Sequence, residues 1–327
     1  MGVSCQHCGI PDNGGMILPF ASSQDPAALD RLRELQLPHL QALLGRLSPG
    51  PVSSPALDDD SPDLPHHHVM ACAVGLQRAD ADAHLAGWPW AAAHSERPTE
   101  AHAWFTPCHY QIGMDHVRLI PPADLALSAE HSQALCQALA DLCAEDGIEL
   151  RWQRPDRWLA RGEVFRSVSG LNLERLSGRT VETQHLHHSP GLKRLHNEAQ
   201  MLFYTQPAHD ERVAQGLLPI NGFWLSGAGA CATAPDWSRR PVVIDALQTH
   251  ALRGDWAAWA RAWTEVDAAL AEPLARVQAG QTFDLTLCGE RHSQVWQTPT
   301  TPASPWRARW QALWHKPPSP TGVLSAL

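Results

Sequence analysis

Long apolar runs are missing from this 327-residue sequence, and no stretch approaches the ~20 apolar residues that a membrane span requires. Long runs of Lys or Arg are also missing, and the formal net charge of −9 disfavours a general nucleic-acid surface. The N-terminus lacks a basic region followed by an apolar stretch, so no secretory signal is evident. We therefore predict a cytoplasmic protein that binds neither membranes nor nucleic acid.

A regular cysteine framework is lacking as well. The eight cysteines are scattered over the chain, which at this length favours reduced thiols over a disulfide scaffold. Cys5 and Cys8 form only half of a tetrahedral zinc site, which normally needs a second pair of ligands. Residues 1–15 therefore have two interpretations, a flexible leader or part of a zinc site.

What the sequence does contain is material for a large core. At 35.9 kDa, with 44% hydrophobic residues and 14 tryptophans, we expect one large domain or a core with an inserted domain. A short buried strand at 16–21 precedes a leucine-rich helix at 26–47 that is broken at Pro38, which is how a parallel α/β sheet begins. The pattern further predicts helices at 128–145 and 254–274 and strands at 148–153, 157–160, 164–165, 239–246 and 283–287.

Histidines gather in two places. His66, His67 and His68 open a predicted helix, where adjacent side chains point in different directions and cannot all bind one ion. His185, His187 and His188 lie in a predicted loop. Solvated histidines are the interpretation that we favour for both groups.

The most informative stretch runs from Asn197 to Gly229. An amphipathic run ending at Tyr204 leads through a Gly-Leu-Leu-Pro turn at 216–219 to an apolar strand at 220–225 and a Gly-rich loop at 227–229. This order of elements is how α/β folds bring backbone N–H groups to a ligand.

The same stretch resembles a segment of the archaeal-type cofactor-independent phosphoglycerate mutases, which belong to the alkaline phosphatase superfamily. It is most similar to a bacterial offshoot described as regulatory proteins of pathogenicity-factor clusters, whose "TPCHxxxGxDHV" block is matched by residues 106–117. The resemblance implies a mostly parallel, alkaline-phosphatase-like sheet flanked by helices, with an inserted α+β subdomain. We assign the leader to 1–15, the core to 16–100 and 230–297, the insertion and hinge to 101–229, and a Pro/Trp-rich tail to 298–327.

The resemblance also implies two divalent metals and a Ser or Thr nucleophile, because phosphoryl transfer needs an activated nucleophile and concentrated positive charge. The sequence departs from these motifs. The loop after the first strand has no carboxylate before Asp25, and the phosphate-binding Arg of the family is Ser226. The remaining candidate metal ligands, none in an intact motif, are Glu290, His292, Asp255 and His250.

We therefore predict a mutase-like protein with a degenerate metal site that is regulatory or binds a small anionic, phosphorylated ligand. Arg212 is the expected anion anchor, because a guanidinium grips a carboxylate or phosphate with two hydrogen bonds. The expected pocket combines His109, Asp115, His116, Asn197, Glu198, Gln200, Arg212 and Asn221.

Two alternative functions and the role of the tail stay open at this stage. The first alternative is an active metal-dependent mutase or phosphatase with rearranged ligands, which would be an isomerase-type enzyme using Mn or Zn. Another is a zinc protein organised by Cys5, Cys8 and the histidines. The basic, aromatic tail at 306–316 is either a helix docked on the body or a site for a protein partner.

Overall fold

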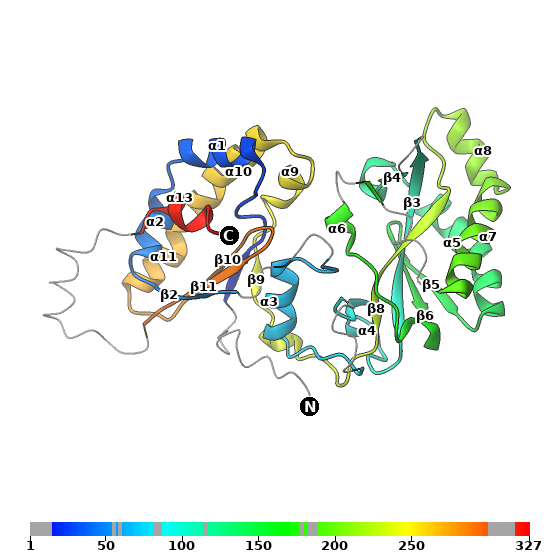
Figure 1. The fold of residues 1–327 in the computed structure, drawn as a ribbon, viewed down its shortest axis with the longest axis horizontal. Coiled ribbons are helices and arrows are strands. Elements are labelled where there is room, and N and C mark those ends of the chain that lie inside the picture. The colour runs from blue at the N-terminus through cyan, green and yellow to red at the C-terminus, as the bar shows by residue number, and fades with distance from the viewer. Residues whose placement is uncertain are drawn as a thin grey trace, which may run out of the picture. The chain divides into compact units, whose positions relative to one another are not determined.

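The computed structural model describes residues 15–53, 57, 61–80, 87–113, 117–176, 180–181, 189–299 and 318–327. The chain divides into two compact units, and each is described by itself. The described residues of unit 1 lie within 61–63 and 75–235, and those of unit 2 within 15–57, 64–74 and 236–327 (Figure 1). Among the described helices, none is both long enough and apolar enough to cross a membrane.

Unit 2 contains a five-stranded mixed sheet with the order β2-β11-β10-β1-β9. Strand β1 pairs in parallel with both β10 and β9, with Ile17 opposite Thr286 and Val243. The other two ladders, β10–β11 and β11–β2, are antiparallel. The expected parallel sheet is therefore present in half of its ladders. The strands are β1 (Met16–Leu18), β2 (Ser48–Val52), β9 (Val242–Val243), β10 (Asp284–Cys288) and β11 (Ser293–Gln297).

Seven helices accompany this sheet among the described residues of unit 2. They are α1 (Pro26–Glu34), α2 (Pro38–Leu44), α3 (Pro65–Ala73), α9 (Gln248–Leu252), α10 (Trp256–Ala269), α11 (Ala271–Gln278) and α13 (Pro320–Leu324). The break at Pro38 that the sequence predicted separates α1 from α2. The buried face of α10 carries Trp259, Trp263 and Val266, whose spacing of three to four residues predicted a core face.

Unit 1 is built on an antiparallel sheet. Its strands follow the order β5-β6-β3-β4-β7, and β8 pairs with the long central strand β3. The strands are β3 (His102–Ile112), β4 (Val117–Ile120), β5 (Glu149–Arg154), β6 (Arg157–Arg161), β7 (Thr180–Val181) and β8 (Gly222–Gly229). The helices are α4 (Trp90–Ala93), α5 (Ala129–Glu145), α6 (Leu173–Leu176), α7 (Pro190–Tyr204) and α8 (Pro207–Ala214).

Helices α5 and α7 pack together beside this sheet, and their apolar faces form the core of unit 1 with it (Figure 1). Phe105 of β3 stacks on Phe223 of β8, with ring centroids 4.1 Å apart, and contacts Phe165 edge-on. Helix α5 begins at the predicted cap, where the Ser128 side chain accepts a hydrogen bond from the amide of His131. It ends before Gly147, which has the positive φ typical of a helix terminus.

Four expected elements differ in the structure. The Gly-rich segment 227–229 belongs to β8 instead of forming a loop, because it pairs with β3 through Gly229. Residues 164–165 lie in a 3₁₀ helix, Glu163–Phe165. The expected core strand 239–246 is reduced to the two residues of β9, at the sheet edge, with Val242 57% exposed. The expected helix 254–274 is divided at Leu270, where α10 ends and α11 follows.

A buried serine connects α5 to two tryptophans of unit 1. Ser132 is fully buried, donates a hydrogen bond to the Pro155 carbonyl, and accepts from the indole N–H groups of Trp152 and Trp158 at 3.0 and 2.9 Å. A single hydroxyl thus satisfies two indoles inside a hydrophobic core.

We expect Ser132→Ala to lower the free energy of unfolding by about 2 kcal/mol, because the substitution leaves the buried Trp158 N–H and the Pro155 carbonyl without partners. Urea unfolding measures the loss. Ser128→Ala, which removes only the helix cap, is expected to cost about 1 kcal/mol. Equal stability of Ser132→Ala and the natural protein would contradict this role of the hydroxyl.

Candidate functional site

The parallel strands of unit 2 end at one edge of the sheet, where α/β folds place their chemistry. The segment after β1 turns at Phe20, whose φ of 54° is in the left-handed region that non-glycine residues rarely adopt. The amide of Ala21 then donates to the Cys288 carbonyl at the end of β10. Backbone strain of this kind is found at ligand sites, which makes this edge the candidate site of unit 2.

A serine and a glutamate join the two strand ends. The Ser23 hydroxyl donates to Glu290 Oε1 at 2.7 Å, and the amide of Gln24 donates to Oε2 at 3.3 Å. The hydroxyl of the neighbouring Ser22 is buried and has no hydrogen-bond partner among the described residues. The edge therefore holds one carboxylate already bonded within the fold and one unsatisfied hydroxyl.

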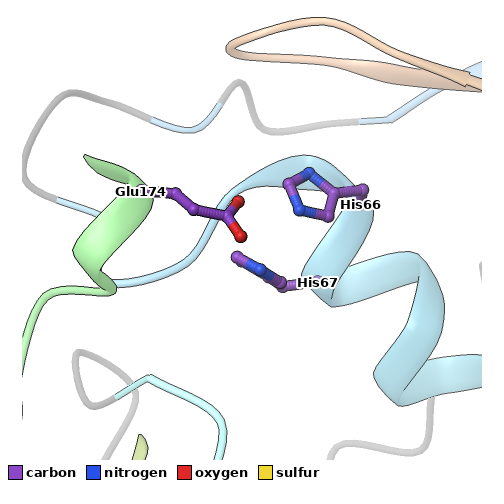
Figure 2. Close-up of side chains that lie close together, drawn as sticks. All are labelled: His66, His67 and Glu174. Atoms are coloured by element: carbon purple, nitrogen blue, oxygen red, sulfur yellow. The ribbon is translucent and has the colours of Figure 1, made fainter. Parts of the chain in front are cut away.

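The first turn of α3 adds two histidines to unit 2. His66 contacts the Phe20 ring, with centroids 5.4 Å apart, and so lies next to the end of β1. The rings of His66 and His67 are 4.0 Å apart, which differs from our expectation that adjacent histidines diverge. Figure 2 shows the pair at the start of α3.

The tautomer of His67 follows from its hydrogen bond. Its Nδ1 lies 3.1 Å from the amide nitrogen of Leu64, and since an amide N–H can only donate, Nδ1 accepts. In a neutral imidazole the proton is then on Nε2. A metal ligand would need an unprotonated nitrogen, which neutral His67 does not offer in this tautomer.

The four candidate metal ligands have structural roles or stand apart. Glu290 accepts hydrogen bonds from Ser23 and Gln24, as described above. Asp255 caps α10 by accepting from the amide of Ala258 at 2.9 Å. His292 donates from Nδ1 to the Ser53 carbonyl at 2.9 Å, which leaves Nε2 able to accept, and His250 lies on α9. In the described part of the chain, none of the four is close enough to two other His, Cys, Asp or Glu side chains to share an ion with them.

Three expected ligand-binding residues of unit 1 converge on the segment that connects α8 to β8. His109 Nδ1 donates to the Pro219 carbonyl at 2.7 Å. The Asn221 side chain bonds to both main-chain groups of Tyr110, accepting at 2.6 Å and donating at 3.0 Å. Each side chain thus continues the pairing between β3 and the residues before β8.

Arg212 is the third residue of this group, and it is fully buried. Its guanidinium donates to the carbonyls of Leu218 at 2.9 Å, Ala126 at 3.4 Å and Leu125. Burial lowers the pKa of this guanidinium from its ordinary value. An anion would have to displace the carbonyls, so the geometry supports a structural role for Arg212.

The remaining expected pocket residues lie elsewhere. Asn197 and Gln200 are exposed on α7, and Glu198 is within 3.9 Å of Arg194 on the same helix. Asp115 and His116, like Cys5, Cys8 and the histidines at 185–188, lie outside the described residues. Two surface hollows of unit 1, of about 330 and 520 Å³, are lined by none of the expected ligand residues.

The residues that sequence analysis missed are Phe20, Ser22 and the Ser23–Glu290 pair. Ser23 and Glu290 are 267 positions apart, so no local pattern predicts their hydrogen bond. The one available signal was the absence of a carboxylate directly after β1, where the resembled family has its metal-binding Asp.

No protein-family model and no curated protein sequence matches the chain. Among solved structures, the chain is similar to the cofactor-independent phosphoglycerate mutase from Thermoplasma acidophilum DSM 1728. The identity is 14%, the match covers 88% of this chain and 90% of that chain, and the TM-score is 0.37. It is also similar to the PH0037 protein from Pyrococcus horikoshii, at 9% identity, 89% coverage of each chain and a TM-score of 0.47.

Proposed function

We propose that the protein is a non-catalytic, regulatory relative of the phosphoglycerate mutases that binds a small anionic, phosphorylated ligand. The proposed site is the edge of the unit 2 sheet formed by the segment after β1, the end of β10 and the first turn of α3. The observation that carries this proposal is the Ser23–Glu290 hydrogen bond, where the resembled family has metal-binding carboxylates.

Two-metal phosphoryl transfer needs about six to eight oxygen and nitrogen ligands that converge on the ions. Here the carboxylate of Glu290 accepts from a hydroxyl and an amide, and that of Asp255 caps a helix. A carboxylate that already accepts such bonds has fewer lone pairs for a cation. Without concentrated positive charge, the transition state of phosphoryl transfer is not stabilised.

Anion binding at this edge is supported by an unsatisfied hydroxyl. The buried Ser22 hydroxyl has no hydrogen-bond partner in the described part of the chain. A ligand oxygen that accepted from it would satisfy a group whose burial otherwise costs about 1–3 kcal/mol. The strained Phe20 holds this segment next to His66.

The test is thermal unfolding in the presence of inorganic phosphate or 3-phosphoglycerate. At a ligand concentration 100 times the Kd, stabilisation of about 2.7 kcal/mol is expected. Ser22→Ala should weaken binding at least tenfold. His68→Ala, on α3, is the control and should bind as the natural protein does.

Four outcomes would count against the proposal. Absence of stabilisation by either anion, or undiminished binding in Ser22→Ala, would remove the assigned site. Mutase turnover with added manganese that Glu290→Ala abolishes would show an active enzyme instead. Elemental analysis of untagged protein that found one zinc per chain would favour the zinc-protein alternative.

A further inference from the structure

Exposed large hydrophobic side chains are concentrated in one part of unit 1. Six such residues occur in the described part of the chain, and four of them lie between positions 201 and 218. Met201 and Tyr204 are the most exposed, at 74% and 70%, followed in this region by Val213 and Leu218. A cluster of exposed apolar side chains on a folded unit marks an interaction surface.

The two most exposed residues lie on a continuous stripe of α7. The buried face of this helix consists of Leu192, Leu195, Ala199 and Phe203, which pack into the core. The opposite face is exposed at Lys193, Asn197, Gln200, Met201 and Tyr204, with the spacing that places residues on one side of a helix. We call these five residues the α7 stripe. Figure 1 shows α7 beside α5, next to the sheet of unit 1.

Helix α8 extends the surface beyond the end of α7. The Tyr204 ring contacts His209 edge-on, with centroids 4.8 Å apart, so α8 begins beside the stripe. Asp210 and Val213 are three residues apart on α8 and both exposed, which places a carboxylate and an apolar side chain on one face. The surface therefore continues past Tyr204 and ends in acidic residues.

The charges at the two ends of this surface are opposite. Lys193, at one end, precedes Met201 by eight residues, or about 12 Å of helix. Asp210, at the other end, follows Met201 by nine residues. A two-fold axis near Met201 would bring the lysine of one copy opposite the aspartate of the other, twice. The surface is thus complementary to itself, as an isologous interface requires.

We propose that a second copy of this chain occupies this surface, with the two α7 stripes antiparallel around a two-fold axis near Met201. Met201 and Tyr204 form the apolar centre, and Lys193 of each copy pairs with Asp210 of the other. A 15-residue helix is about 22 Å long, so α7 and α8 together provide a contact region suited to a standard-size interface. The surface lies in unit 1, so it is separate from the proposed anion site in unit 2.

The test is sedimentation velocity of the full chain between 5 and 100 µM. The natural protein is expected to form a dimer in this range. Met201→Glu should weaken dimerisation at least tenfold, because it places two like charges at the centre of the interface. Val242→Glu is the matched control, since Val242 is also an exposed apolar residue (57%) but lies on β9 of unit 2. It should leave the dimer unchanged.

A charge exchange tests the predicted register. Lys193→Glu and Asp210→Lys should each weaken the homodimer several-fold, and the double variant should restore it. A mixture of the two single variants should form a heterodimer in which both ion pairs are present. A monomer at 100 µM, a dimer unaffected by Met201→Glu, or failure of both restorations would overturn the proposal.

Discussion

Replacing Arg212 by alanine is expected to lower the free energy of unfolding of unit 1 by about 4 kcal/mol. The guanidinium is fully buried and donates to three main-chain carbonyls on two segments, so its loss leaves these acceptors unsatisfied. Hydrogen bonds from a charged donor contribute about 1.5–3 kcal/mol each, and partial relaxation reduces the sum. Ala126, whose φ of 46° is strained, can relax once this contact is lost, which offsets part of the cost.

Hydrogen exchange measured by mass spectrometry can assign this loss to one unit. In Arg212→Ala, amides of β3 and β8 should exchange faster, while those of β1 and β10 should keep their rates. Arg154→Ala is the matched control, because Arg154 is half exposed and pairs with Asp156 on the surface. Its effect should stay within about 0.5 kcal/mol. A comparably small effect of Arg212→Ala would restore the anion-anchor interpretation.

Replacing Asp267 by alanine is expected to destabilise unit 2 by about 3 kcal/mol. This carboxylate on α10 is buried and accepts from the amides of Leu40 and His39 at 2.8 and 3.3 Å, at the start of α2. His39 Nδ1 lies 2.9 Å from the same carboxylate. Asp267 therefore caps α2 from another helix, where Leu37 provides no side-chain cap. Its removal leaves two amides of α2 without their acceptor.

Denaturant unfolding of three variants tests this cap. Asp267→Asn keeps one acceptor oxygen and should lose about half as much stability as Asp267→Ala. Asp30→Ala is the control, because Asp30 is exposed and pairs with Arg33 on α1. It should be within about 0.5 kcal/mol of the natural protein. Identical losses in Asp267→Asn and Asp267→Ala would show that the charge, and not the second oxygen, dominates.

Local signals in the sequence were sufficient for most helices. Ser128 and Gly147 delimit α5, Pro38 separates α1 from α2, and the tryptophan spacing gives the buried face of α10. These signals succeed because caps, proline and helical periodicity act over a few residues. The α/β class followed for the same reason.

Tertiary structure alone decided what the polar residues of the two units do. The sequence by itself marked Arg212 as a cation in an informative stretch, but its three carbonyl partners depend on how α8 packs against the turn before α5. Likewise, Glu290 meets Ser23 only because β1 and β10 are adjacent and parallel. Hydrogen bonding between residues hundreds of positions apart is fixed by strand order and burial, which no short pattern encodes. The sequence therefore determined the helices and the fold class, whereas packing determined which polar groups were already satisfied by the fold.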